Sequence, residues 1–183
     1  CPACAAGAPT WSATSARRPP DLSPALLMIR AGLIPAVAVA VADQASKWWI
    51  LLDVMNPPRV LEMAPFFNIV LTFNRGVSFG LLDSDSPWGQ PLLIALAAAI
   101  SAFLVVWMCK AESLFVARAI GLTLGGALGN VIDRFIHGGV VDFLDFHASG
   151  AHWPAFNVAD AAITSGVALL LFDALIVERT KHK

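Results

Sequence analysis

The sequence predicts a mainly α-helical membrane protein with four transmembrane helices. Of its 183 residues, 57% are hydrophobic and 14% are charged, whereas a soluble domain carries roughly 25% charged residues. The mean hydropathy is +0.70. Because about 20 apolar residues cross a bilayer core of about 30 Å, the chain has room for a few spans with modest loops. The composition argues against a water-soluble single domain.

Four apolar stretches supply these spans. The clearest is residues 91–109, which has 19 residues and no charge and is long enough to cross a membrane as a helix. The others are residues 25–44, with Pro35 as an expected kink, residues 113–132 and residues 158–177. Four spans return the chain to its starting side, so both termini are expected on one side of the membrane.

The cations indicate which side this is. Lys and Arg near the ends of spans are retained in the cytoplasm, and eight lie on the terminal side against four on the other. Both termini are therefore expected in the cytoplasm. The net charge of −1 gives no sign of nucleic-acid binding. The terminal side holds Arg17, Arg18, Arg30, Lys110, Arg118, Arg179, Lys181 and Lys183, and the outer side holds Lys47, Arg59, Arg75 and Arg134.

The same pattern divides the chain into a membrane domain and two tails. Residues 1–24 are rich in Pro, Ala, Ser and Thr and are expected to form a disordered cytoplasmic tail. Residues 178–183 are expected to form a second cytoplasmic tail. Residues 25–177 are expected to form a four-helix transmembrane domain with outer loops at about residues 51–90 and 134–155.

Two other patterns concern local structure. Residues 60–74 are aromatic and β-branched and too short to cross, which predicts one or two strands lying on the membrane. Gly121, Gly125 and Gly129 have the GxxxG spacing of closely packed membrane helices. This spacing predicts that the third helix packs tightly against its neighbours.

Metal and redox sites are poorly supported. Cys1 and Cys4 have CxxC spacing but no second pair, so a disordered tail is favoured over a redox or half-zinc site. His137, His147 and His152 fall in the second outer loop without the HExxH spacing of a zinc peptidase. No metal or other cofactor is expected.

The ionisable residues avoid the centres of all four spans. Such residues are unfavourable inside a bilayer and mark functional sites, so the empty centres argue against a proton relay across the membrane. Asp173 is an exception to the outer placement of these residues, because it lies four residues from the inner end of its span. The others gather at the outer ends of the spans and in the adjacent loop: Asp43, Lys47, Asp133, Arg134, Asp142 and Asp160.

Several of these residues admit a structural interpretation. Asp43 and Lys47 are spaced i, i+4, which favours an ion pair closing the end of the first helix. Asn130 and Arg134 are placed to satisfy free carbonyls at the end of the third helix. That role does not account for Asp133, because the helix dipole disfavours an acid at a C-terminus.

The fourth helix begins with a capping pattern. Asn157 and Asp160 have the spacing of a capping box, and this interpretation carries about as much weight as a functional one. Asp142 is different, because it lies in an apolar run, residues 139–143, with no helix to cap. The two acids are therefore candidates to face each other across one site.

Five segments together support a family assignment. In chain order they are residues 43–47 (DQASK), 74–80 (NRGVSFG), 125–134 (GGALGNVIDR), 140–143 (VVDF) and 156–160 (FNVAD). They resemble the motifs of the bacterial lipoprotein signal peptidases, also called signal peptidase II. The resemblance implies an aspartic intramembrane protease with four transmembrane helices, a small β-rich cradle on the outer surface, and no metal or organic cofactor.

The resemblance also implies a substrate, a location and site residues. The substrates are expected to be prolipoproteins with a diacylglyceryl-modified cysteine, cut on the N-terminal side of that cysteine. The enzyme is expected to be a monomer in the bacterial inner membrane, in contact with membrane lipids and not with nucleic acid, with its active site near the outer leaflet. By motif, Asp142 and Asp160 are the catalytic pair, and Arg75 has no expected role. The supporting or substrate-binding positions are Asp43, Lys47, Asn74, Gly76, Asn130, Asp133, Arg134 and Asn157.

Hydrolysis by two carboxyl groups needs one ionised to take a proton from water and one protonated to polarise the carbonyl. Asp160 is expected to be the base, because the field at a helix N-terminus favours negative charge, and Asp142 is then the acid. Two rival functions stay open: a small transporter or channel, and a noncatalytic binding protein of the membrane that kept the fold and the polar cluster. Cleavage of a lipidated prolipoprotein that is lost in Asp142→Asn and Asp160→Asn separates the protease from both.

Overall fold

Four long helices form the body of the protein. The computed structural model describes residues 24–76 and 88–181, with side chains up to residue 175. Within those ranges, four helices have the length and hydropathy of membrane spans, and the chain is a multi-pass membrane protein, as its composition predicts. The helices are α1, Pro24–Trp49; α2, Gly89–Cys109; α3, Leu114–His137; and α4, Val158–Lys181.

Three helices run further than the sequence predicts: α4, which continues past residue 177 to Lys181 into the expected C-terminal tail, and α1 and α3. α1 continues past residue 44 and then as a π-helical segment, η1 (Ile50–Val54). α3 continues past residue 132 and ends at Gly138, whose φ of 67° is left-handed. The apolar pattern stops early in α1 and α3 because the polar residues that follow are buried against one another instead of lying in loops. The second outer loop is correspondingly shorter than expected.

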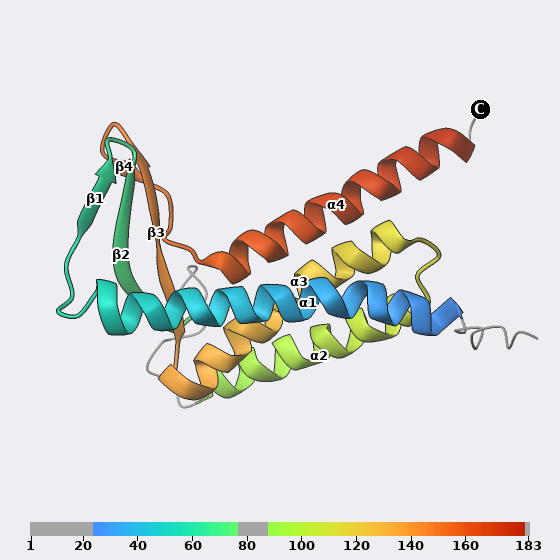
Figure 1. Cartoon of the computed structure of the whole chain (residues 1–183), viewed down its shortest axis with the longest axis horizontal. Coiled ribbons are helices and arrows are strands. Elements are labelled where there is room, and N and C mark those ends of the chain that lie inside the picture. The colour runs from blue at the N-terminus through green and yellow to red at the C-terminus, as the bar shows by residue number, and fades with distance from the viewer. Residues whose placement is uncertain (1–23, 77–87, 182–183) are drawn as a thin grey trace, which may run out of the picture.

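A small antiparallel sheet stands at the end of the bundle furthest from the start of α1, with its strands running across the helices (Figure 1). β1 (Leu61–Ala64) and β2 (Phe67–Asn74) pair with each other, which confirms the strands predicted in residues 60–74. β2 also pairs with β3 (Val140–Ala148), and β3 pairs with the short strand β4 (Ala151–His152). The sheet therefore joins the two outer segments, which are distant in sequence.

The chain that leads into α4 is held against β3. Phe156 and Leu144 exchange backbone hydrogen bonds of 2.9 and 3.1 Å. Asn157 follows directly, so the first turn of α4 starts beside the middle of β3. This arrangement brings the side chains of the two segments together.

The GxxxG prediction is confirmed by the packing of α3. A Cβ on Gly121 would collide with the carbonyl of Gly32 in α1, and one on Gly125 would collide with the carbonyl of Ala36. On another face of α3, a Cβ on Gly126 would collide with the backbone of α4. Glycine therefore lets α3 approach both neighbours at backbone distance.

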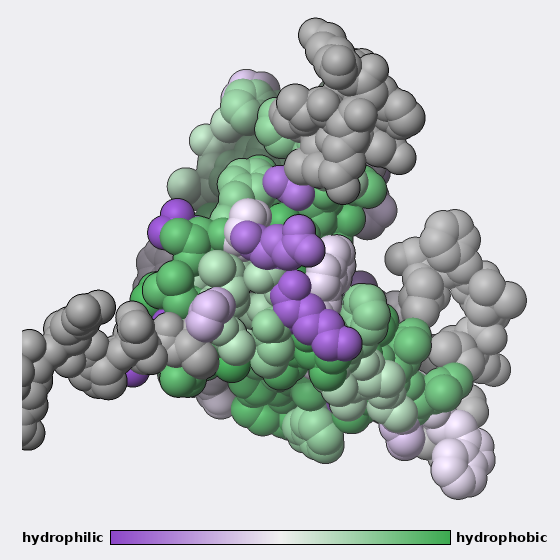
Figure 2. Space-filling model, turned by 90° about the vertical axis from the view of Figure 1, so that its right-hand side faces the viewer, coloured by the Kyte–Doolittle hydropathy of each residue, from purple (hydrophilic) through white to green (hydrophobic). Residues whose placement is uncertain are grey.

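The outward faces of the helices are apolar, as contact with lipid requires. Ile34 and Phe103, for example, are 72% and 64% exposed. Figure 2 looks onto the end at which α1 begins, where hydrophilic residues stand out against a hydrophobic surface. Arg30, Lys110 and Arg118 are exposed near the helix ends on this side. They are cations of the side that the sequence predicts to be cytoplasmic.

Replacing Gly125 with Leu should destabilise the protein by about 2 kcal/mol, because the added side chain forces α1 and α3 apart. Thermal unfolding in detergent measures this as a lower Tm. The matched control is Ala98→Leu, at an exposed position of α2, which should leave Tm nearly unchanged. Equal effects of the two substitutions would contradict close packing of α3 on α1.

Candidate active site

The Lys47 ammonium is the centre of a buried ionic cluster. Its Nζ lies 2.7 Å from Oδ2 of Asp43 and 2.7 Å from Oδ2 of Asp133. It also donates a 3.2 Å hydrogen bond to Oδ1 of Asn130, so three acceptors surround its three donor hydrogens. Lys47, Asp43 and Asp133 are each at most 1% exposed. Burial of these charges is tolerated because they pair with one another.

The two carboxylates extend the cluster to neighbouring elements. Asp43 Oδ1 accepts a 2.9 Å hydrogen bond from the N–H of Ala159 in the first turn of α4. Asp133 Oδ2 accepts a 3.0 Å hydrogen bond from the N–H of Val141 in β3. The Asp43–Lys47 ion pair is therefore confirmed, and Lys47 lies in the last turn of α1. The pair does more than close that helix end, because it links α1 to α3, α4 and β3, and it accounts for Asp133.

Asn130 and Asn157 connect this cluster to the two acids that the sequence singles out. Asn130 Nδ2 donates a 2.8 Å hydrogen bond to Asp160 Oδ1. Asn157 Nδ2 donates a 2.7 Å hydrogen bond to Asp142 Oδ1 and lies 3.3 Å from Asn130 Oδ1. A chain of hydrogen bonds therefore runs from Lys47 through both amides to both carboxylates.

Asp160 combines a structural role with its place in this network. Its N–H donates a 2.9 Å hydrogen bond to Asn157 Oδ1, and its Oδ2 accepts a 3.3 Å hydrogen bond from the N–H of Asn157. These two bonds form the capping box that the sequence predicts. The other carboxylate oxygen accepts from Asn130. The two interpretations are compatible, since different oxygens of one side chain serve them.

The register of β3 places Asp142. Asn74 pairs with Val140 across β2 and β3, so Asp142 lies diagonally from Asn74 on the same face of the sheet, where the Asn74 amide lowers the pKa of its carboxyl group. Burial, and then the neighbouring negative charge of Asp160, raise the pKa of Asp142 to about 6 against the opposing effect of the Asn74 and Asn157 amides. The two acids are thus electrostatically coupled.

Gly76 supports this arrangement through Asn74. The N–H of Gly76 donates a 3.3 Å hydrogen bond to Asn74 Oδ1 and so fixes the amide that lowers the pKa of Asp142. Residues 77–80 of the same motif lie outside the described residues.

Arg134 does not satisfy a free carbonyl at the end of α3, as the structural interpretation of the sequence expects. Its Nη1 donates a 3.1 Å hydrogen bond to the Asn130 carbonyl, one turn inside α3, while the N–H of Gly138 caps the end of the helix. The guanidinium is attracted electrostatically to Asp160 and, less strongly, to Asp133. Its buried Nε has no hydrogen-bond partner among the described residues.

Gln44 belongs to the site although the sequence does not predict it. Its Nε2 donates hydrogen bonds of 2.8 Å to Asp133 Oδ1 and 3.2 Å to the Gly129 carbonyl. A Cβ on Gly129 would collide with the Asp43 carboxylate, so the cluster needs glycine there. In a continuous helix, Asp43, Gln44 and Lys47 lie within about 100° of one another. If the first helix had been predicted to continue past residue 44, this shared face would have identified Gln44 from the sequence.

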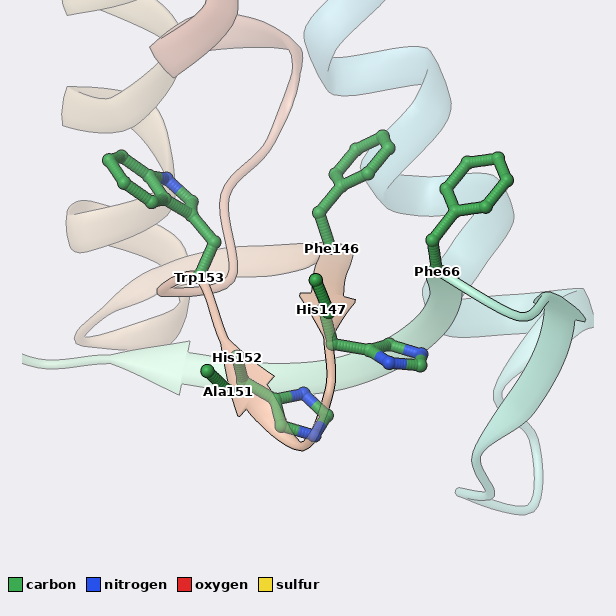
Figure 3. Close-up of a pocket in the computed structure, with 7 residues that line it drawn as sticks. Phe66, Phe146, His147, Ala151, His152 and Trp153 are labelled. Carbon is green, nitrogen blue, oxygen red and sulfur yellow. The ribbon is translucent and has the colours of Figure 1, made fainter.

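His147 and His152 lie on the sheet, away from these acids, whereas His137 lies in the last turn of α3 and not in the outer loop where the sequence predicts it. His147 and His152 stack with their ring centroids 4.9 Å apart. In Figure 3 their imidazoles project to one side of the hairpin, and the rings of Phe66, Phe146 and Trp153 project to the other. These residues line a groove of about 360 Å³.

The His152 ring pairs with a carboxylate of β3. His152 Nδ1 lies 2.9 Å from Asp145 Oδ1, and this hydrogen bond lowers the pKa of Asp145. Across residues 24–76 and 88–181, no group of three His, Cys, Asp or Glu side chains is arranged to hold a metal ion. Cys1 and Cys4 lie outside the described residues.

Comparison with known proteins decides the family. A family model described as signal peptidase (SPase) II matches residues 35–176, which is most of the chain. The chain belongs to the signal peptidase II family. The resemblance seen in the five sequence motifs is thereby confirmed, and the protein is an aspartic-type peptidase that acts in the cleavage of signal peptides from prolipoproteins.

Individual relatives agree with this assignment. The chain is 42% identical over 154 residues to the lipoprotein signal peptidase of Nitrobacter hamburgensis, covering 81% of this chain and 93% of the relative. It is 42% identical over 169 residues to that of Azoarcus sp., covering 90% and 94%. A solved bacterial membrane enzyme at 2.3 Å resolution superposes with a TM-score of 0.72 and 34% identity, covering 85% of this chain and 93% of the other. The predicted helical membrane fold with a small sheet is thus confirmed.

Replacing Lys47 with Met should lower the free energy of unfolding by about 3–5 kcal/mol, because it leaves the Asp43 and Asp133 carboxylates buried without their cation. Unfolding by SDS or heat measures the change. Lys110→Met removes an exposed cation and should change stability by less than about 0.5 kcal/mol. If the two variants were equally stable, Lys47 would not hold the elements together.

Proposed function

We propose that this signal peptidase cuts prolipoproteins by an intramembrane aspartic mechanism, on the N-terminal side of the diacylglyceryl-modified cysteine, with Asp142 and Asp160 as the catalytic pair. The observation that carries the proposal is the convergence of these two acids on the Asn130–Asn157 amides, with Asp160 contributing to the raised pKa of Asp142. Coupled carboxyl groups of this kind supply one acid and one base at the same pH. A transporter would need ionisable groups deeper in the spans, and a binding protein has no need for such coupling.

The two carboxyl groups have different roles. Asp160 lies in the first turn of α4, where the helix dipole favours its ionised form, and it takes a proton from the attacking water. Asp142, whose pKa is raised to about 6, is protonated and donates to the substrate carbonyl oxygen. When the tetrahedral intermediate collapses, Asp160 passes the proton that it took from water to the leaving amine, and Asp142 recovers its proton from the hydroxyl group that becomes the carbonyl of the new carboxyl end. Because the two groups interact, the protons leave in steps that describe the pair and not either residue alone.

The surrounding donors position these groups. Asn130 holds Asp160 and Asn157 holds Asp142, while the Asn74 amide helps to limit the pKa of Asp142. Arg134 retains a buried Nε donor without a partner among the described residues. We assign this donor to a carbonyl of the bound substrate.

The distribution of charge supports a location for the site. The exposed cations Arg30, Lys110 and Arg118 lie near the helix ends away from the sheet, and cations near span ends favour the cytoplasm. We therefore place both termini in the cytoplasm and the sheet on the outer face of the bacterial inner membrane. A lipidated cysteine is anchored in the outer leaflet. Asp160 lies three residues along α4 from Asn157, so the site is about 5 Å inside the outer boundary of the membrane. The substrate then reaches the site laterally from the lipid.

Asp142→Asn and Asp160→Asn should each lower cleavage of a lipidated prolipoprotein at least about 100-fold, because each removes a general acid or base. Mass spectrometry of the product, with thermal unfolding as the folding control, measures the loss. Wild-type product should begin at the lipidated cysteine. A folded variant that still cleaves would remove its residue from the catalytic pair.

The pH profile tests the assignment of acid and base. The kcat/KM should fall as pH rises through about 6, because Asp142 loses its proton there. Asn157→Ala removes a hydrogen bond that lowers the pKa of Asp142, so the fall should move to higher pH. Asn68→Ala is the control, because Asn68 makes the corresponding bond to Asp145, outside the site. An unchanged profile in Asn157→Ala would overturn Asp142 as the acid.

A further inference from the structure

A groove extends from Asp160 along α4. Its volume is about 380 Å³, and the mechanism above uses only one of the side chains that line it. Four of the residues share a face of α4 at spacing i, i+1, i+4 and i+5, and two precede the helix. The lining residues are Trp153, Phe156, Asp160, Ala161, Thr164 and Ser165.

Two hydroxyl groups in this groove are free to bind a ligand. Thr164 and Ser165 are exposed on a membrane helix. A buried hydroxyl in such a helix commonly bonds to the carbonyl four residues earlier, as Thr123 does to Ala119 at 3.1 Å. Neither Thr164 nor Ser165 has a hydrogen-bond partner within the described residues. Their donors are therefore directed at the groove and the lipid rather than used within α4.

The direction of α4 relates these hydroxyls to the substrate. If the function proposed above holds, the signal peptide descends from the scissile bond toward the cytoplasm, and so does α4 from Asp160. Ser165 lies five residues, or about 7.5 Å, along the helix from Asp160. An extended chain covers this distance in about two residues. The groove thus lies beside the two residues that precede the scissile bond.

These two residues need hydrogen-bond partners during cleavage. A peptide bond in an α-helix has its carbonyl bonded within the helix, so the substrate must unwind before the two acids reach it. Unwinding frees N–H and C=O groups, and unsatisfied groups of this kind are strongly unfavourable in a bilayer. The small side chain of Ala161 leaves room for a backbone to approach Thr164 and Ser165.

We propose that Thr164 and Ser165 form a substrate subsite that hydrogen-bonds to the unwound backbone of the two residues before the scissile bond. The subsite recognises peptide groups rather than side chains. It therefore accepts signal peptides of different sequence, provided that they unwind at this point.

The test compares Thr164→Val, Ser165→Ala and the double variant with wild type on a lipidated prolipoprotein peptide. Each substitution should lower kcat/KM about fivefold, the effect of one hydrogen bond, without changing Tm. Thr164→Ser keeps the hydroxyl and should retain the wild-type rate. Ser101→Ala removes a hydroxyl from α2, outside the groove, and is the control. Unchanged kcat/KM in the double variant would overturn the subsite.

A second substrate series separates contact from a structural effect. Each of the two peptide bonds before the scissile bond is replaced in turn by an ester, which lacks the N–H and is a weaker acceptor. At least one ester should slow wild-type cleavage and should have little further effect on the double variant. Equal ester effects in both enzymes would overturn the contact. A wild-type protein that leaves the amide peptide uncut would instead overturn the proposed function on which the subsite rests.

Discussion

The structure depends on one buried ammonium group. Lys47 of α1 meets Asp43, Asp133 and Asn130 within 2.7–3.2 Å, and through these partners it reaches α3, the first turn of α4 and the start of β3. The glycines of α3 make this possible, because only their lack of a side chain lets α1 come close enough. The close packing of α1 on α3 and the pairing of the buried charges therefore depend on each other, since the ions can pair only where the helices touch.

The same cluster sets the electrostatics of the two acids. Asp142 is 2% exposed and lies near Asp160, so burial and like charge raise its pKa, while Lys47 and the neighbouring amides limit the rise. One acid has a raised pKa and the other lies at a helix N-terminus, which suits a reaction that needs one protonated and one ionised carboxyl group at once. The site gains this property from residues that also stabilise the fold.

Much of this could be predicted from the sequence, but not all of it. The four helices follow from hydropathy, and the roles of Gly121 and Gly125 follow from their spacing. The ends of α1 and α3 could not be predicted, because Gln44, Lys47 and Asp133 resemble the start of a loop until their partners are known. The strand that carries Asp142 could not be predicted either, since its pairing with β2 depends on a segment 66–79 residues earlier in the chain. Long-range pairing is what local patterns leave out.

The central claim is that Asp142 and Asp160 form one coupled site. Titration of Asp142 by NMR of carboxyl-labelled aspartate, with its resonance assigned by Asp142→Asn, tests this directly. The account predicts a midpoint near pH 6 in the wild type and a lower midpoint in Asp160→Asn, which removes the neighbouring negative charge. A midpoint near that of an ordinary aspartate, about 4, or one that Asp160→Asn leaves unmoved, would contradict it.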